Sequence, residues 1–296
     1  MQAVETIIRG GELLIFELQQ ADYKKVFSLV DGKKETKVLL LSVLSGNNAG
    51  RVFVDNINAP KTALIWVLGN VFYFLGDSGN NNFLGSINEF IDTTIATMSR
   101  NLVNPNAQFE TLIYHNDWQQ VLDKLFQNRK LTKNSVDDSD YMFTFNKEHY
   151  FSSKVKQITL PEGYVIKKVC NDTITTESTQ ILRKDILDFW ESVDKFLQIG
   201  FGYCVIKDNK AVAICFSAYV HEHYHEIAIR TYVQEERRKG LATMVGRAYL
   251  DYCVENGLIP AWSTQHTNTV SHAVAEKLGF EFHSKLPSIM FPYRHQ

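Results

Sequence analysis

The residues best suited to chemistry lie in one short segment near the C-terminal end of the chain, from Glu226 to Thr243. This segment reads as a strand, a basic turn and the start of a helix, and the turn has the spacing R-x-x-G-x-A at Arg237, Gly240 and Ala242. A helix start presents unpaired backbone N–H groups, and the helix dipole attracts anions, usually phosphates, to them. The sequence therefore predicts a phosphate-binding loop.

The residues of this turn have separate parts in the predicted site. Gly240 allows the backbone to approach the ligand closely, and Ala242 is small for the same reason. Three side chains add positive charge, and the backbone amides of residues 238–243 would hold the phosphates. The predicted binding residues are Arg237, Arg238, Lys239, Gly240, Leu241, Ala242 and Thr243.

A second pattern follows at Asn268-Thr-Val-Ser271 and closes at Leu278-Gly-Phe280. Together with the basic turn it resembles the GNAT acetyltransferase superfamily, whose consensus Q/R-x-x-G-x-G/A binds the pyrophosphate of acyl-CoA. The resemblance implies a GNAT fold for the C-terminal half and acetyl-CoA as co-substrate, with no metal. It also implies that Asn268 contacts the pantetheine arm or holds the helix start, with Ser271 nearby. An ordinary helix N-cap at Asn268 is the alternative.

The resemblance can be narrowed to one subfamily. Several further stretches are similar to a bacterial GNAT subfamily that includes the zwittermicin A self-resistance acetyltransferase. They are Thr231, the Arg-Lys-Gly-Leu-Ala run, Pro260-Ala-Trp262, Ser271 to Phe280, and, in the N-terminal half, Gly50–Asp55 and Phe72–Asp77. The resemblance therefore covers most of the chain.

Catalytic residues are expected on the strand that precedes the basic turn. The resemblance implies a general base there, for which Glu226 and His225 are the candidates. Side chains alternate along a strand, so only one of the two can face the acceptor, and we favour Glu226. An ordinary exposed strand residue is the alternative for Glu226. The backbone N–H of Val233, beside an expected bulge in the strand, is the predicted oxyanion donor.

Ala275 departs from the family pattern, because many GNAT enzymes have a tyrosine general acid at this position. Tyr232, Tyr249 or a water molecule would then protonate the leaving thiolate. A dedicated acid is also dispensable, since a thiol has a pKa near ~8.5 and its thiolate leaves readily.

Two groups of side chains have both functional and structural interpretations. His221, His223 and His225 alternate along an expected strand and could bind zinc, but we favour a hairpin tip and the substrate cleft. Three aromatic residues lie where the resemblance places the roof of the acceptor site, although core packing is the favoured interpretation. They are Phe189, Trp190 and Phe196.

Composition limits the class of protein. The 296 residues have a formal charge of −2, with 45% hydrophobic and 22% charged residues, which gives no basic footprint for nucleic acid. The four cysteines have no metal-binding or disulfide spacing, which fits a reducing cytoplasm. No secretory signal and no apolar stretch of ~20 residues is present. We expect a cytoplasmic monomer or homodimer whose partner is a small-molecule amine, with neither nucleic acid nor membrane.

The N-terminal half repeats the element order of the C-terminal half. Both halves read as β-α-α-β-β-β-α-β-α, and the C-terminal half adds two closing strands. The loop Gly76–Asn82 corresponds to the basic turn but has no Arg or Lys and contains Asp77, which would repel a pyrophosphate. We expect an α/β chain with two GNAT-like domains in tandem, each a mixed sheet flanked by helices. Residues 1–145 would be a degenerate domain and residues 146–296 the acetyl-CoA-binding domain.

These patterns predict an acetyl-CoA-dependent N-acetyltransferase that acts on a primary amine of a small molecule. The alternative is a non-catalytic protein that binds or senses acyl-CoA, which Ala275 and the degenerate half favour. An amine antibiotic as acceptor is implied by the resemblance alone.

Overall fold

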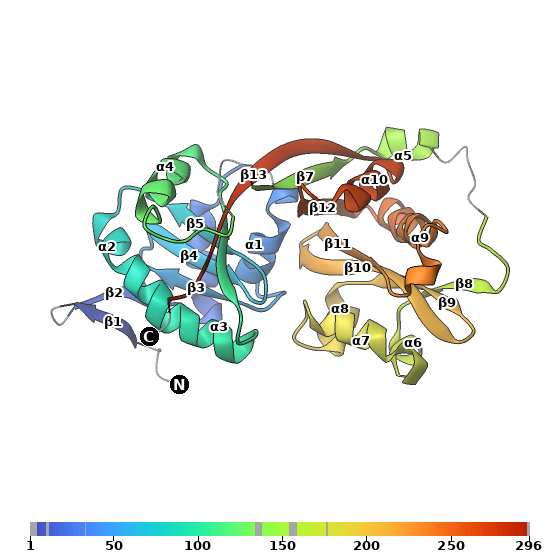
Figure 1. Cartoon of the computed structure of the whole chain (residues 1–296), viewed down its shortest axis with the longest axis horizontal. Helices are drawn as coiled ribbons and strands as arrows, with labels where there is room; N and C mark the ends of the chain where they lie inside the picture. The colour runs from blue at the N-terminus through green and yellow to red at the C-terminus, as the bar shows by residue number, and fades with distance from the viewer. Residues whose placement is uncertain are drawn as a thin grey trace. The chain divides into compact units, whose positions relative to one another are not determined.

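The computed structural model describes residues 5–9, 12–32, 34–133, 138–153, 159–175 and 177–294 of the chain. These residues belong to two compact units, which are drawn in Figure 1. Unit 1 comprises residues 1–32, 43–140 and 285–296, and unit 2 comprises residues 33–42 and 141–284. Each unit is built on a mixed β-sheet with helices packed against it.

The strands of unit 1 follow the order β1-β2-β3-β4-β5-β6-β13. Neighbouring strands are antiparallel, except β5 and β6, which are parallel. The strands are β1 (Glu5–Arg9), β2 (Glu12–Glu17), β3 (Gly50–Val54), β4 (Thr62–Val67), β5 (Phe72–Gly76), β6 (Gln108–Leu112) and the end of β13 (Phe280–Pro292). The helical segments are a 3-10 helix at Gln20–Leu29, α2 (Asn81–Phe90), a π-helical stretch at Ile91–Ile95, α3 (Ala96–Leu102) and α4 (Asn116–Leu125).

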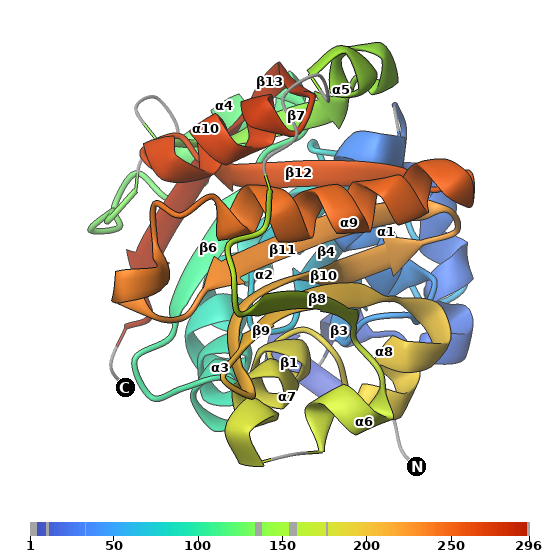
Figure 2. The ribbon, with the colours of Figure 1, turned by 90° about the vertical axis from the view of Figure 1, so that its right-hand side faces the viewer.

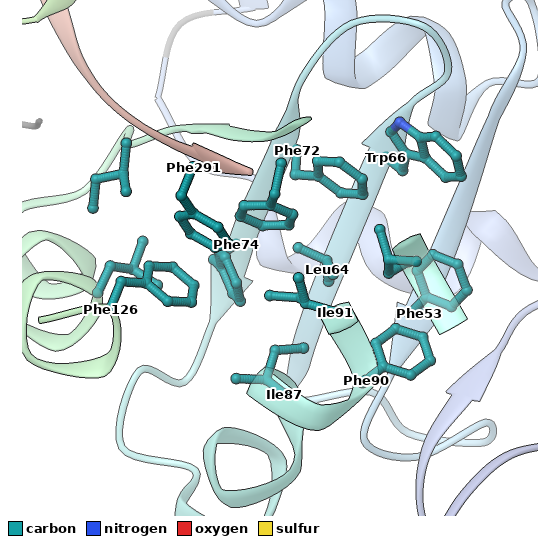
Figure 3. Packing of buried hydrophobic residues seen from close by; sticks show 14 of the residues in the cluster. Phe53, Leu64, Trp66, Phe72, Phe74, Ile87, Phe90, Ile91, Phe126 and Phe291 are labelled. Carbon is teal, nitrogen blue, oxygen red and sulfur yellow. The ribbon is translucent and has the colours of Figure 1, made fainter. Parts of the chain in front are cut away.

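Apolar and aromatic side chains fill the core of unit 1, as Figure 3 shows. Alternate strand residues such as Leu64 and Phe74 point to this core, because successive side chains of a strand face opposite ways. Ile87 and Phe90 come from one face of α2, and the Phe90 ring meets Phe53 edge to face with centroids 5.0 Å apart. Aromatic rings packed with aliphatic side chains therefore form the core of this unit.

The strands of unit 2 follow the order β13-β7-β12-β11-β10-β9-β8. The strands from β8 to β11 are mutually antiparallel, and β11 is parallel to β12. The strands other than β13 are β7 (Ser139–Phe145), β8 (Tyr164–Lys168), β9 (Gly202–Lys207), β10 (Lys210–His221), β11 (Tyr224–Thr231) and β12 (Ile259–Gln265). The α-helices are α5 (Lys147–Ser153), α6 (Asn171–Ile174), α7 (Gln180–Leu187), α8 (Val193–Ile199), α9 (Leu241–Glu255) and α10 (Thr269–Lys277), and 3-10 turns lie at Lys34–Thr36, Glu177–Thr179 and Gln234–Glu236.

Helices cover both faces of the unit 2 sheet, as Figures 1 and 2 show. Helices α9 and α10 pack on one face, where Val245 and Leu278 belong to the same core cluster. Helices α6, α7 and α8 pack on the other face around Leu182, Ile186 and Phe196. The two faces of the sheet thus have separate cores, so successive residues of β11 face different helices.

Three elements change unit along their length. Helix α1 (Val38–Leu44) and β13 begin in unit 2 and end in unit 1, whereas β7 begins in unit 1 and ends in unit 2. The compact units therefore differ from the two halves of the sequence. The domain boundary between residues 145 and 146 stays a prediction about those halves.

The predicted element order agrees with the structure, with local differences. The sequence predicts a helix from Arg238 to about Asn256, but α9 begins at Leu241. Arg238 and Gly240 have left-handed φ angles of 64° and 77°, which an α-helix cannot contain. The two strands expected at the C-terminus form the single strand β13.

The polar, charged sequence of residues 127–160 predicts a connection between the two halves, with Tyr141–Phe145 as a candidate edge strand. In the structure this stretch contains β7 and α5. The predicted strand at Tyr141–Phe145 is therefore present, but it lies between β12 and β13 rather than at an edge. Residues 134–137 and 154–158 of this stretch lie outside the described residues.

Candidate active site

The candidate site begins where β11 and β12 part. Their parallel register joins Tyr224–Glu226 to Ile259–Ala261 and covers only the first three residues of each strand. Strand β11 continues to Thr231 and β12 to Gln265 without further mutual pairing in this described part of the chain. Glu226 is the last residue of β11 in the ladder, so it marks the point of separation.

Helix α9 begins beyond the end of β11 without a side-chain cap. Its N-cap is Gly240, with φ 77° and ψ 7°, and the first bond within the helix runs from Met244 N–H to the Gly240 carbonyl at 3.0 Å. The amides of Leu241, Ala242 and Thr243 therefore have no acceptor inside the helix. Their N–H groups and the dipole of this 15-residue helix favour an anion at its start.

The basic side chains of the loop divide into two kinds. Arg237 and Arg238 are exposed, and Arg238 adopts a left-handed φ of 64°, which is unfavourable for a residue with a Cβ and recurs at functional sites. Lys239 is also exposed, but its ammonium lies 2.9 Å from the Glu236 carboxylate. The charge of Lys239 is therefore partly neutralised by a neighbour that the sequence analysis did not single out.

Glu226 lies on one side of β11 and is 4% exposed. Its Oε1 accepts a hydrogen bond from the Ser263 hydroxyl at 2.6 Å, and Ser263 is on β12. The bond therefore joins the two strands just past the point where their backbone ladder ends. The alternative of an ordinary exposed strand residue is wrong, because the side chain is buried.

His225 lies in the core on the α9 side, and the interpretation in which it sits in the substrate cleft does not fit this position. The ring is 3% exposed, and its Nδ1 is 2.9 Å from the Ser217 hydroxyl, which in turn is 2.9 Å from the Tyr249 hydroxyl of α9. Burial lowers the pKa of His225 to about 4, so the imidazole is neutral at pH 7. The expected opposition of His225 and Glu226 across the sheet agrees with these contacts.

Val233 lies just after β11 and caps the 3-10 turn Gln234–Glu236. The expected bulge beside it is wrong: the irregularity opposite β11 is in β10, where Ala218 is the extra residue between Ser217 and Tyr219. The Val233 carbonyl accepts from the Glu236 N–H at 3.1 Å, while the Val233 N–H has no bond to another described residue. This amide is thus available as a donor without a bulge.

The alternative general acids are both engaged elsewhere. The Tyr232 hydroxyl donates to Asp185 of α7 at 2.8 Å, and burial raises the pKa of Tyr232. The Tyr249 side chain is fully buried, and desolvation raises its pKa well above the usual value. Ala275 is also fully buried, so this position lines the core rather than an open site.

Asn268 is the N-cap of α10. Its side chain is exposed and accepts from the Ser271 N–H at 3.2 Å, which is the geometry of the alternative interpretation. The Ser271 hydroxyl accepts from the Trp262 indole N–H at 3.1 Å, which ties β12 to α10. These bonds leave the Asn268 amide N–H₂ as the group that could contact a pantetheine arm.

Comparison with known proteins decides the family. The family model for GNAT acetyltransferases matches residues 28–288, which is most of the chain. The chain belongs to the GNAT acetyltransferase family. A Bacillus subtilis (strain 168) protein named "Uncharacterized N-acetyltransferase YdfB" is 28% identical over 265 residues, covering 90% of this chain and 94% of that protein. This GNAT protein is therefore an acyltransferase.

Solved structures show the same fold over nearly the whole length. A GCN5-related N-acetyltransferase-like protein from Streptococcus suis 89/1591 has a TM-score of 0.60 at 18% identity, covering 92% of this chain and 98% of that one. A tandem GNAT protein from the clavulanic acid biosynthesis pathway has a TM-score of 0.59 at 11% identity, covering 95% and 99%. The predicted α/β tandem GNAT fold is confirmed.

The aromatic residues proposed as an acceptor roof belong to the core of this GNAT protein. Trp190 is 2% exposed and its indole N–H donates to the Ser217 carbonyl at 2.8 Å, and Phe196 is fully buried. Phe189 packs edge to face against Phe216 and Tyr219. Core packing is therefore the interpretation that fits all three.

The three histidines do not share one face of a strand in this GNAT protein. His221 ends β10 and His225 is in β11, whereas His223 lies in the turn between the two strands. Among the residues that the structure describes, no group of His, Cys, Asp or Glu has the arrangement of a metal site. Of the helices described, none has the length and apolar character that crossing a bilayer requires.

The cavity of about 960 Å³ in unit 2 of the GNAT protein lies elsewhere, among α6, α7 and α8. None of the predicted site residues lines it. Its lining residues include Ile174, Arg183, Lys184, Leu187, Asp188 and Val193.

Four residues that contact the site were missed by sequence reasoning. Asp185 could have been identified from the sequence, because it shares the buried face of α7 with Leu182 and Ile186, where a carboxylate needs a partner. Glu236 could not, because its partners come from distant strands. The remaining two are hydroxyls whose roles depend on strand pairing, namely Ser217 and Ser263.

Proposed function

We propose that this protein is an acetyl-CoA-dependent N-acetyltransferase that transfers an acetyl group to the primary amine of a small molecule. The observation that carries the proposal is the uncapped start of α9 at Gly240, beyond the end of β11 where β11 and β12 have parted. Free amides, a helix dipole and two exposed arginines form a site that fits a diphosphate. The protein would act as a monomer or homodimer, without a metal, nucleic acid or membrane.

The chain's own residues have defined parts in this proposal. The amides of residues 238–243 and the side chains of Arg237 and Arg238 hold the pyrophosphate of acetyl-CoA. The Val233 N–H donates to the thioester oxygen, where negative charge develops during attack. Lys239 supports the loop, and Asn268 with Ser271 flanks the opening from the β12 side.

Glu226 is the proposed general base. It takes a proton from the acceptor ammonium, directly or through water, and the free amine then forms a bond to the carbonyl carbon. The carbon–sulfur bond breaks, and the nitrogen releases its second proton to water as the amide forms. The departing thiolate takes a proton from water, because Tyr232 and Tyr249 hold theirs in buried hydrogen bonds. His225 stays neutral in the core and serves the fold.

A second function is favoured by one observation. Ala275 replaces the tyrosine acid of many GNAT enzymes and is fully buried, which fits a protein that binds acyl-CoA without turnover. The likeness to the zwittermicin A self-resistance subfamily favours catalysis with an amine antibiotic as acceptor. The narrower subfamily and this acceptor are both part of the proposal.

The test is release of free thiol from acetyl-CoA in the presence of a panel of primary amines. We expect amine-dependent thiol release, which Gly240→Asp abolishes because it adds bulk and negative charge at the diphosphate and loses contacts of ~1.5–3 kcal/mol each. Gly257→Asp is the matched control, because Gly257 has a similar φ of 67° beyond the other end of α9 and open space around it. Binding without thiol release for any amine would favour the sensing function instead.

A further inference from the structure

One buried carboxylate immediately precedes the proposed phosphate loop and bonds to it through Lys239. Glu236 is the last residue of the 3-10 turn that follows Val233, and it is 7% exposed. The residue immediately after it is Arg237, the first basic residue of the loop. Along the chain, Glu236 therefore lies between Val233, the proposed oxyanion donor, and the residues of the proposed phosphate site.

Three donors converge on this carboxylate. Lys207 Nζ lies 3.0 Å from Oε1, and Lys239 Nζ lies 2.9 Å from Oε2. The Tyr164 hydroxyl donates to Oε2 as well. Tyr164 begins β8 and Lys207 ends β9, and the two residues face each other in the register of these strands. The carboxylate thus links the loop to two strands of the sheet.

The charges in this cluster favour its ionised form. The hydrogen bond from Tyr164, followed by the one from Lys239, lowers the pKa of Glu236 to about 2. The same carboxylate raises the pKa values of Lys207 and Lys239. The cluster of Tyr164, Lys207, Glu236 and Lys239, called the Glu236 clamp below, is therefore held by charge-assisted bonds at neutral pH.

The backbone that the clamp holds is strained. Lys239 lies between Arg238 and Gly240, which have φ angles of 64° and 77°. A left-handed conformation is unfavourable for arginine, so the loop needs an external restraint to keep it before a ligand binds. The bond from Lys239 to Glu236 supplies such a restraint, because Tyr164 of β8 and Lys207 of β9 anchor the Glu236 carboxylate to the sheet.

We propose that Glu236 is a positioning residue that holds the phosphate loop in its ligand-binding conformation in the free protein. This inference rests on the proposed function, because it concerns the same loop and the same ligand. Pre-organisation raises affinity by removing the cost of ordering the loop on binding. Glu236 therefore strengthens the binding of an anion even though it is itself an anion.

The direction of the change in acetyl-CoA affinity distinguishes a positioning role of Glu236 from a purely Coulombic one. If only Coulomb interactions mattered, removing a carboxylate beside a diphosphate would increase affinity. If Glu236 positions the loop, the same removal decreases affinity. Glu235 provides the matched control, because it is the preceding residue in the same turn and its side chain is exposed.

The experiment compares Glu236→Gln and Glu235→Gln in the full-length protein by calorimetric titration with acetyl-CoA. We expect Glu236→Gln to weaken binding by about 10-fold or more, and Glu235→Gln to leave it unchanged or slightly tighter. In turnover assays, Glu236→Gln should raise KM and leave kcat within about 3-fold, as expected for a residue that acts on binding. Equal or tighter binding by Glu236→Gln would overturn the inference.

Two further variants protect the test. Tyr164→Phe removes one donor and no charge, so it should weaken binding in the same direction, and it decides the matter if Glu236→Gln does not fold. Glu236→Asp should recover part of the lost affinity, because it restores the charge on a shorter side chain. Absence of acetyl-CoA binding by the wild-type protein would contradict the proposed function itself, and the inference would fall with it.

Discussion

The corresponding helix starts in the two halves of the chain differ in whether side chains cap them. In the N-terminal half, α2 begins after Asn80, whose Oδ1 accepts from the Phe83 N–H at 3.2 Å. The Asn80 amide also donates to Asp55 at 2.9 Å, and Asp77 accepts from the Gly79 N–H at 2.8 Å. Side-chain oxygens of the chain itself therefore accept from amides at this helix start and just before it, and two carboxylates lie beside it.

In the C-terminal half, the corresponding helix α9 begins after Gly240 and has no side-chain cap. The preceding loop supplies the exposed Arg237 and Arg238, while its acid Glu236 is buried and paired with Lys207 and Lys239. The two halves share an element order, so the difference lies in which groups fill the helix start. We infer that topology supplies the anion site in both halves and that side chains close it in one of them.

The largest expected effect tests whether the two halves can be compared as separate domains. A fragment of residues 146–296 lacks residues 34–42 and 141–145, which belong to unit 2. It also leaves the last strand residues without β6, their partner in unit 1. We expect this fragment to show no cooperative thermal unfolding by circular dichroism, in contrast to the full chain. A fragment that unfolds cooperatively and binds acetyl-CoA would support the boundary at 145 and 146 as a true domain limit.

The next effect concerns the chemistry that the C-terminal half alone should perform. Glu226→Gln preserves the shape of the side chain and its bond to Ser263 while removing the base. We expect turnover to fall by ~10²-fold or more with acetyl-CoA affinity nearly unchanged, the range that general-base catalysis supplies. Glu222→Gln is the control, because this half-exposed residue pairs with Lys34 at the hairpin turn, where an ion pair contributes little. Full turnover in Glu226→Gln would move the base elsewhere.

Part of the fold and of the candidate site can be predicted from the sequence, because it depends on residues that are close together in the chain. The strand-turn-helix pattern at Glu226–Thr243 and the acids of the Gly76–Asn82 loop are local features, so they could be read directly. The opposition of Glu226 and His225 followed from strand alternation.

Contacts between distant segments could not be predicted in this way. The Glu236 clamp joins residues 72 and 29 positions apart in the chain, and no local pattern encodes those pairs. The irregularity lies at Ala218 of β10 and not in β11 beside Val233, because its position depends on the pairing of β10 with β11. Likewise, the repeat of elements along the sequence does not reveal that α1, β7 and β13 each run from one unit into the other.

A third prediction extends the comparison to the cores. Phenyl rings pack in the cores of both units, and unit 2 also buries the His225 imidazole near Tyr249 of α9. The His225 pKa of about 4 in the folded state lies below the unfolded value of ~6.5, so the unfolded chain binds the proton first as pH falls. Stability should therefore be complete above pH ~6.5 and decline toward pH 4, with His225 contributing about 3 kcal/mol of that loss.

Urea unfolding at a series of pH values measures this contribution. His225→Gln keeps a polar side chain but cannot titrate, so its stability should fall less between pH 7 and pH 4.5 than that of the wild type. An identical pH dependence in both proteins would mean that another group is responsible.

The smallest expected effect tests the closed helix start of the N-terminal half. Asn80→Ala removes the cap of α2 and the bonds to Asp55 and Thr62, which should lower the free energy of unfolding by ~1–2 kcal/mol. It should leave acetyl-CoA affinity unchanged, because Asp55 and Asp77 still repel a diphosphate. Urea unfolding and a calorimetric titration of the same sample give both quantities. A change in affinity with a modest change in stability would mean that this loop takes part in binding.

The number of acetyl-CoA molecules bound per chain tests the central comparison most directly. Calorimetric titration of the wild-type protein should give one site, because, of the two corresponding helix starts at α2 and α9, that of α9 alone is uncapped and preceded by exposed arginines. Saturation at two molecules per chain would contradict the account, since the helix start closed by Asn80 and Asp77 would then also bind the ligand.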